Sequence, residues 1–246
     1  MIIDCHVHLR HGDEERNEYS PEDIVGVMSA TGIDHSVVFA MSCPTRRSIE
    51  MASAAARAFP ARLIPFAYAL PGGEGSVVAE LEEAITRLGF RGIKIHGGEC
   101  DLSGRVIDDV LGLAVEKQVP CLVDFIGRHK DLERMARGFP GLDIVTAHLG
   151  KYLCEDVELI DRFIEVACRF PRVYLDTSGV VLDGKIMEAV GRLGASRIVF
   201  GSDGPGPRTD PARTAREAIE RVRKEGLGAD EERAVLGGNI AGLLRL

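Results

Sequence analysis

The chain begins Met1-Ile2-Ile3-Asp4-Cys5-His6-Val7-His8, a short apolar run that ends in two histidines. The apolar residues of this stretch predict a strand over residues 2–7. Residues two apart on a strand project from the same face, so the two imidazoles point to one place, roughly 6–7 Å apart along the chain. Two histidines on one strand face are typical of a metal site, and a pair of hydrogen-bonded core histidines is the alternative.

Similar apolar, β-branched runs recur along the chain, each bounded by Gly, Pro or polar residues. They predict further strands over residues 35–40, 63–69, 91–96, 120–125, 143–148, 172–177 and 197–202. Segments with helical periodicity lie between them, over residues 45–58, 76–88, 105–118, 129–138, 155–169 and 183–193, and a last helix is expected over residues 230–244. Ser20-Pro21 and Asp210-Pro211 each predict a helix start, with a capping side chain before a proline at the first helical position.

This alternation of strands and helices predicts parallel strands joined by right-handed crossovers. Eight such units fit a closed (β/α)8 TIM barrel better than an open doubly wound sheet, because polar residues stand at the carboxyl ends of many strands. The length of 246 residues is usual for one barrel, so we expect an α/β fold with a single domain over residues 1–246.

Composition narrows the class of partner. The 30 basic and 38 acidic residues give a formal charge of −8 with no basic block, which argues against nucleic acid and favours a small-molecule substrate. The six cysteines form no C-x-x-C pair and indicate reduced thiols in a cytoplasmic protein. No run approaches the ~18 apolar residues of a membrane helix, and we expect no targeting segment. The sequence leaves a homo-oligomer open.

Polar side chains stand at the ends of the predicted strands, where a barrel of this kind has its active site. They are His6, His8, Lys94, His96, Asp124, His148, Asp176, Ser178 and Asp203. Each alone has an ordinary explanation: Lys94 can support a carboxylate, Asp176 can cap a helix, and Asp203 can form an Asx turn in its Gly/Pro loop. Because all of them meet on one rim, together they predict a functional site.

Four motifs occur in a recognisable order: Ile3–His8, Gly92–His96, Ala147–Gly150 and Phe200–Asp203, followed by a closing Leu236–Leu244 helix that contains Gly-Asn. With them the chain resembles the amidohydrolase superfamily over its whole length. The similarity is to the branch of metal-dependent hydrolases and of decarboxylases of the aminocarboxymuconate-semialdehyde and resorcylate types. The His-x-His pair with a late Asp is the more specific part of the resemblance.

The resemblance implies that His6, His8 and Asp203 bind a divalent metal, that Asp203 accepts a proton in a hydrolase, and that His148 acts as acid or base. Members of this branch carry a further histidine at the end of strand five, where this chain has Asp124. We expect Asp124 to face the same cavity and to ligate the ion or hold a water on it. Zn²⁺ is the expected ion, with Mn²⁺ or Fe²⁺ as alternatives, because an oxygen ligand suits them better.

The leading hypothesis is therefore a metal-dependent hydrolase of a small lactone, amide or carboxylate-bearing substrate. The metal would polarise the carbonyl and lower the pKa of water, while Asp203 takes a proton and His148 protonates the leaving group. Lys94, His96 or Arg10 would bind a substrate carboxylate.

Other functions remain open on the same residues. A metal-dependent non-oxidative decarboxylase is the second hypothesis, although such enzymes are generally longer. A barrel that binds a ligand without metal is the third, and Asp124 is its main support. A carboxylated Lys94 that bridges two metals is a further alternative from other branches. A TatD-like nuclease is disfavoured, because that resemblance would require a Glu on strand four, where this chain has Lys94 and His96.

Overall fold

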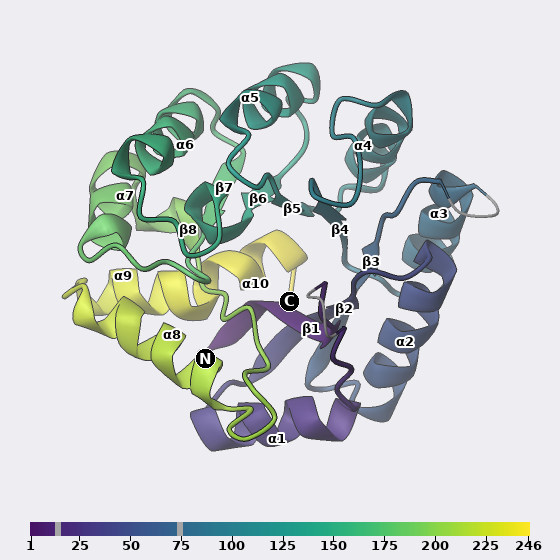
Figure 1. The fold of residues 1–246 in the computed structure, drawn as a ribbon, viewed down its shortest axis with the longest axis horizontal. Coiled ribbons are helices and arrows are strands. Elements are labelled where there is room, and N and C mark those ends of the chain that lie inside the picture. Colours follow the sequence, from purple (N-terminus) through teal and green to yellow (C-terminus); the bar gives the residue numbers. More distant parts are fainter. Residues whose placement is uncertain (13–15, 73–75) are drawn as a thin grey trace.

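The computed structural model describes residues 1–12, 16–72 and 76–246, and these residues form a single eight-stranded sheet curled into a barrel (Figure 1). The strands follow one another in chain order, and each is parallel to the next. They are β1 (Ile3–Arg10), β2 (His35–Ala40), β3 (Leu63–Tyr68), β4 (Gly92–His96), β5 (Cys121–Asp124), β6 (Ile144–Thr146), β7 (Val173–Asp176) and β8 (Ile198–Val199). The predicted α/β class and TIM barrel are confirmed.

The segment that follows β8 closes the barrel against β1. We call this junction, between β1 and residues 200–204, the seam of the barrel. Because β8 is only two residues long, the hydrogen bonds of the seam come mostly from residues that follow β8. Cys5 N donates to Phe200 O at 3.0 Å, Asp203 N donates to His6 O at 2.9 Å, and His8 N donates to Gly204 O at 2.7 Å. The closing seam therefore sets Asp203 directly beside the two histidines of β1.

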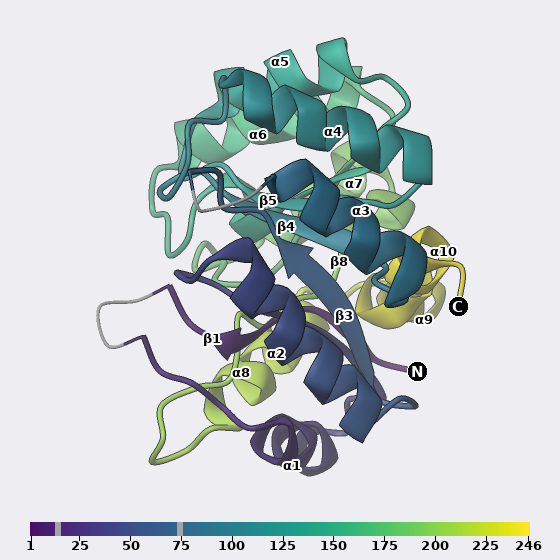
Figure 2. The same cartoon turned by 90° about the vertical axis from the view of Figure 1, so that its right-hand side faces the viewer.

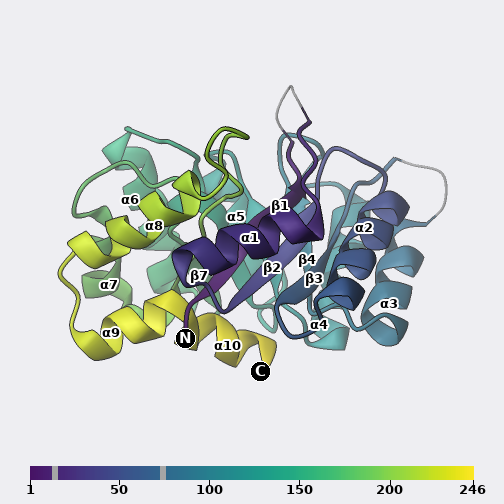
Figure 3. The same ribbon diagram turned by 90° about the horizontal axis from the view of Figure 1, so that it is seen from below.

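Helices surround the barrel, and both termini lie at its amino-terminal end (Figures 2 and 3). The α-helices are α1 (Pro21–Thr31), α2 (Thr45–Ala58), α3 (Val77–Arg87), α4 (Arg105–Lys117), α5 (His129–Gly138), α6 (Val157–Arg169), α7 (Lys185–Leu193), α8 (Arg213–Lys224), α9 (Ala229–Arg233) and α10 (Asn239–Leu244). Short helical turns are η1 (Ala147–Gly150), η2 (Ala195–Arg197) and the π-helical η3 (Ala234–Gly238). None of the described helices is long and apolar enough to span a membrane.

The two predicted helix starts differ in outcome. Ser20 caps α1 with a full capping box, and Pro21 is its first helical residue. The prediction for Asp210-Pro211 is wrong, because α8 begins at Arg213 after Ala212. Asp210 N donates to Pro207 O at 2.9 Å and Asp210 O accepts from Arg213 N at 3.1 Å, so Asp210 lies in a turn before the helix.

Two of the predicted strands are at most half as long as expected, whereas most of the others differ by one or two residues. The strand predicted over residues 143–148 ends at Thr146, because the chain then turns into η1 with positive φ at His148 (60°) and Leu149 (50°). The strand predicted over residues 197–202 ends at Val199, where Phe200 N donates to Val235 O at 3.0 Å and so leaves the sheet. By contrast, β1 is longer than predicted, because it continues to Arg10 instead of ending at residue 7.

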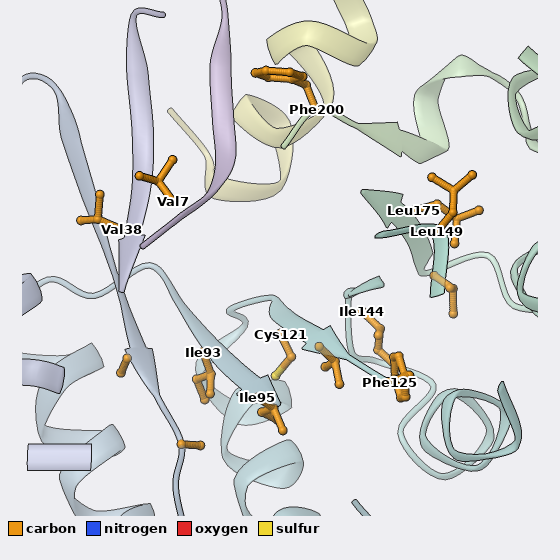
Figure 4. Close-up of a cluster of buried hydrophobic side chains, with 14 of the residues drawn as sticks. Val7, Val38, Ile93, Ile95, Cys121, Phe125, Ile144, Leu149, Leu175 and Phe200 are labelled. Atoms are coloured by element: carbon orange, nitrogen blue, oxygen red, sulfur yellow. The ribbon is translucent and has the colours of Figure 1, made fainter. Parts of the chain in front are cut away.

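Alternating side chains divide the apolar core into two clusters. Residues such as Val38, Ile93 and Ile95 belong to a large cluster that also holds the buried helix residues, and Figure 4 shows part of it. Residues such as Phe39 and Leu122 belong to a smaller cluster inside the barrel. On a strand with outward Ile93 and Ile95, the intervening Lys94 and the following His96 project to the inner side. The alternation thus selects which polar residues reach the barrel interior.

A bulge in β1 turns the two histidines inward. Ile3 and Cys5 belong to the interior cluster, whereas Val7 and Leu9 belong to the outer one. The pairing register with β2 shifts between Asp4 and Val7, and such an extra residue exchanges the faces of a strand. His6 and His8 accordingly line the interior cavity together with the inner side chains of the other strands.

The buried carboxylate of Asp4 holds this bulge and the seam together. It accepts hydrogen bonds from His6 N at 3.1 Å, from Ser202 N at 2.9 Å and from Ser202 Oγ at 2.5 Å. Burial raises the pKa of Asp4 to about 7, against the opposing effect of these donors. One side chain therefore joins β1 to the segment that carries Asp203.

Replacing Asp4 by Ala should destabilise the fold, because it leaves buried donors of His6 and Ser202 without an acceptor. We expect the free energy of unfolding in urea to fall by about 2–4 kcal/mol, as for buried hydrogen bonds to a charged group. Asp109→Ala, on the exposed side of α4, is the control and should change it by less than about 0.5 kcal/mol. A loss below about 1 kcal/mol for Asp4→Ala would contradict this role.

Candidate metal centre

His6 is oriented by a carboxylate on the far side of its ring. Its Nδ1 lies 2.8 Å from Asp176 Oδ2, and because a carboxylate only accepts, Nδ1 carries the proton. The Nε2 lone pair is then directed into the barrel. Burial lowers the pKa of His6 well below its usual value, and the Lys94 ammonium lowers it further. His6 is therefore neutral at pH 7, with the nitrogen that a metal requires.

Two more donor atoms converge on the His6 nitrogen. Asp203 Oδ1 lies 3.2 Å from His6 Nε2 and 2.8 Å from His8 Nε2, and the ligand atoms of these three residues all lie within 4.8 Å of one another. Burial raises the pKa of Asp203, but the hydrogen bond from His8 and the charge of His148 lower it to about 2. Burial and then His11 lower the pKa of His8 to about 4. Two neutral imidazoles and one carboxylate are a donor set that fits a divalent cation such as Zn²⁺ or Mn²⁺.

His148 joins the same network through Ser178. Its Nδ1 lies 3.1 Å from Ser178 O and 2.8 Å from Ser178 Oγ, and Ser178 Oγ donates to Asp176 Oδ2 at 2.6 Å. Nδ1 therefore carries a proton and Nε2 faces the cavity. Burial lowers the pKa of His148, but its hydrogen bond with Asp124 and the charge of Asp203 raise it above the usual value. The arrangement favours a histidine that holds a proton at Nε2.

Asp124 faces the cavity between two histidines. Its Oδ2 lies 3.3 Å from His96 Nε2 and 3.4 Å from His148 Nε2, and its Oδ1 accepts from Ile126 N at 2.8 Å. Burial raises the pKa of Asp124, but the hydrogen bonds from His148 and His96 hold it well below its usual value. Among the described residues, the three-ligand groups are His6, His8 and Asp203, and His6, His148 and Asp176, so Asp124 belongs to neither.

His96 is set to support Asp124. Its Nδ1 accepts from Gly98 N at 3.2 Å, so Nε2 carries the proton and points it toward the Asp124 carboxylate. The ring is therefore engaged with the protein on both nitrogens. We infer a positioning contribution to Asp124 from this geometry, alongside the substrate contact expected from the sequence.

Lys94 lies deeper in the barrel than a substrate-binding residue at the mouth would. It is 1% exposed, and its Nζ lies 3.0 Å from His6 Nε2 and 5.1 Å from the centre of the Phe39 ring. Burial lowers the pKa of Lys94, and the carboxylates of Asp124 and Asp203 oppose that shift. Its ammonium donates to the same lone pair that an ion would use.

Arg10, expected to bind a substrate carboxylate, is directed elsewhere. Its Nη1 donates to Met41 O at 3.1 Å and to Ser42 O, and its Nε lies 3.2 Å from Glu18 Oε1. Within the described part of the chain, the lining of the cavity at the metal centre does not include Arg10. The guanidinium instead ties the end of β1 to the segment after β2.

His11 lines the same cavity, although the sequence pattern did not predict it as a site residue. Its ring stacks on His8, with centroids 4.5 Å apart and planes at 18°, and its Nε2 donates to Pro205 O at 3.1 Å. Its position three residues after His8 is the only feature of the sequence that could have indicated this contact. The loop conformation that brings the two rings together corresponds to no sequence pattern.

One cavity of about 610 Å³ lies at the carboxyl ends of the strands and brings most of these side chains together. Its lining includes seven of the eight residues expected to bind metal, transfer protons or bind substrate: His6, His8, Lys94, His96, Asp124, His148 and Asp203. Arg10 is the eighth, and the predicted rim residues Asp176 and Ser178 contact His6 and His148 but are not part of the described lining. Apolar and aromatic side chains complete its wall: Tyr19, Met41, Ile126 and Tyr152.

Comparisons with known proteins identify the family and the fold of the chain. A family model described as Amidohydrolase matches residues 3–246. The chain is similar in structure to an amidohydrolase from Burkholderia multivorans with bound zinc, at 18% identity and a TM-score of 0.78, covering 100% of this chain and 99% of that one. It is also similar to 5-carboxyvanillate decarboxylase LigW from Sphingomonas paucimobilis, at 16% identity and a TM-score of 0.75, with 100% and 99% coverage.

A third similar structure is a dihydroxybenzoic acid decarboxylase from Polaromonas sp. JS666 with bound manganese and the inhibitor 2-nitroresorcinol, at 17% identity and a TM-score of 0.71, covering 100% of this chain and 97% of that one. No curated protein matches the chain in sequence. At these identities the solved structures support the fold, and the family match covers nearly the whole chain.

Replacing Lys94 by Met should raise the affinity for a divalent metal, because the buried ammonium contacts the His6 nitrogen. We expect an increase of about tenfold or more in calorimetric titrations with Zn²⁺ or Mn²⁺, since repulsion of a dication by a nearby positive charge exceeds about 1.4 kcal/mol at a protein's effective dielectric constant. Lys151→Met, which removes a charge from the cavity rim, should change the affinity by less than about threefold. A lower affinity in Lys94→Met would mean that the lysine assists metal binding.

Variants of Asp124 test whether its carboxylate contacts the metal ion or only supports neighbouring side chains. If its carboxylate contacts the ion or a water on it, Asp124→Asn should lower metal affinity by about tenfold or more, because the charge is lost and the shape is kept. Asp124→His should shift the preference toward Zn²⁺ over Mn²⁺. Titration of each metal into the three proteins measures both effects. Unchanged affinity in both variants would place Asp124 outside the coordination sphere.

Proposed function

Since this chain belongs to the amidohydrolase family, we propose that it is a divalent-metal-dependent hydrolase of a small lactone, amide or carboxylate-bearing substrate. One observation carries the proposal: the ligand atoms of His6, His8 and Asp203 face one cavity that His148 also lines. In this proposal residues 1–246 act as one domain.

A divalent ion held by His6, His8 and Asp203 would act as a Lewis acid on the substrate carbonyl and lower the pKa of water. The chain supplies the proton transfers. Asp203 is ionised at neutral pH, because its pKa lies at about 2, so it is ready to accept a proton from an attacking water. Its position on the seam, 2.8 Å from His8 Nε2, fixes that carboxylate at the reacting end of the cavity.

His148 is the proposed general acid. Its Nδ1 is anchored on Ser178, so the ring presents Nε2 to the cavity and delivers a proton to the leaving group there. Its pKa is raised above the usual value, because the hydrogen bond with Asp124 and the charge of Asp203 outweigh the effect of burial. A histidine that keeps its proton near neutral pH is suited to this step.

The remaining lining favours an anionic substrate. The side chains of Lys151, His11 and His96 add basic groups around the cavity, and Lys94 carries a buried amine. Apolar contact with a compact body is available from Met41 and Ile126. These features support a small substrate with a carboxylate or a carbonyl that develops negative charge.

Metal analysis and a substrate screen test the proposal. Protein purified without added metal is analysed for elements, and the loaded protein is assayed with lactones, amides and aromatic acids. Hydrolysis that disappears with chelation and returns with Zn²⁺ or Mn²⁺ is the expected result. Release of CO₂ from an aromatic acid, with no turnover of lactones or amides, would assign the chain to the decarboxylase alternative.

Replacing His148 by Ala should leave the metal content near that of the wild type and lower turnover by about 10²–10⁴-fold, the usual contribution of a positioned acid or base. His35→Ala, at the start of β2 and away from the cavity, is the matched control and should keep full activity. If His148→Ala purified without metal, His148 would have to be reassigned as a ligand.

A further inference from the structure

Two cavities of the molecule share two lining residues, and the larger of these is a tyrosine. The cavity at the metal centre has a volume of about 610 Å³, and a second cavity of about 710 Å³ lies between α7 and α8. Tyr152 and Thr214 line both of them. A side chain that faces two adjoining cavities acts as the wall between them, so the extent of the metal cavity in this direction depends on Tyr152.

The ring of Tyr152 is fixed from two sides. On one side it packs on Gly179, where an added Cβ would lie 2.3 Å from Tyr152 Cδ2 and where φ is +61°. On the other side it meets His148 edge to face, with centroids 5.1 Å apart and planes at 65°. Leu153 N donates to Gly179 O at 3.1 Å and ties the two loops together. Tyr152 is 47% exposed despite these contacts, as expected for a residue between two open spaces.

The space beyond the ring combines apolar and charged side chains. Val180, Val181 and Met187 contribute apolar surface, and charged residues make up much of the remaining lining: Asp183, Glu217, Glu220, Arg221, Lys224 and Glu225. An apolar arm that extended from the metal centre past Tyr152 would meet the apolar part of this lining, at Val180 and Val181. In the native protein the ring stands in its way.

We propose that Tyr152 is a specificity-determining residue, whose ring ends the metal cavity on the side of α7 and α8 and restricts the substrate to compact molecules without a long apolar arm. The inference rests on the proposed function, because it takes the reacting end of the substrate to lie at the metal centre. In this proposal Tyr152 takes no part in proton transfer, and its ring limits the length of the substrate.

Straight-chain carboxylates from acetate to decanoate test this limit. Their dissociation constants are measured by calorimetry on the metal-loaded protein, where each newly buried methylene should strengthen binding about fourfold. In the wild type the gain should stop at a short chain, and in Tyr152→Ala it should continue to longer chains. Tyr152→Phe keeps the ring and should stop where the wild type does. Leu153→Ala enlarges only the second cavity and should also leave the limit unchanged.

The same limit in the wild type and in Tyr152→Ala would overturn the proposal. Because binding of these probes needs no turnover, an inactive but length-selective protein would contradict the proposed hydrolysis and leave the tyrosine's role supported. A crystal structure of Tyr152→Ala tests whether the ring separates the two cavities, even if no carboxylate binds. One continuous cavity from His148 to Val180 supports the inference, and a wall rebuilt by another side chain overturns it.

Discussion

The closure of the barrel between β1 and the segment after β8 is the constraint on which the site depends. His6 and Asp203 lie almost two hundred residues apart in sequence, and the hydrogen bond from Asp203 N to His6 O, 2.9 Å long, makes them neighbours. The buried Asp4 carboxylate stabilises the same seam, because it accepts hydrogen bonds from Ser202 N and Ser202 Oγ. The interactions that complete the fold therefore also assemble the candidate ligands, so loss of the seam would remove both.

The charged side chains buried inside the barrel stabilise one another, because groups of opposite charge lie close together. Asp124, Asp176 and Asp203 surround Lys94 and the protonatable His148, and the isolated burial of any of these ions would be costly. The shared network through Ser178 links His6, Asp176 and His148, and so sets ring orientation and proton position together. The three carboxylates outnumber the lysine, and a bound dication would offset this excess of negative charge.

The sequence predicted the barrel and most of the site because both follow from periodicity. The alternation that sends Ile93 and Ile95 outward also sends Lys94 and His96 inward, and the parallel strands bring their ends to one rim. What the sequence did not predict depends on local backbone geometry. The bulge in β1, the left-handed residues at His148 and Leu149 and the engagement of Arg10 with backbone carbonyls arise from tertiary contacts that no spacing of residue types encodes. The stacking of His11 on His8 has the same origin.

The central claim is that the seam assembles a three-residue metal site, and a crystal structure of the metal-loaded protein tests it most directly. The account predicts one divalent ion within about 2.0–2.3 Å of His6 Nε2, His8 Nε2 and a carboxylate oxygen of Asp203, the usual distances for these ligands. A fully metal-replete crystal in which these three side chains point apart, or in which the ion binds elsewhere, would contradict it.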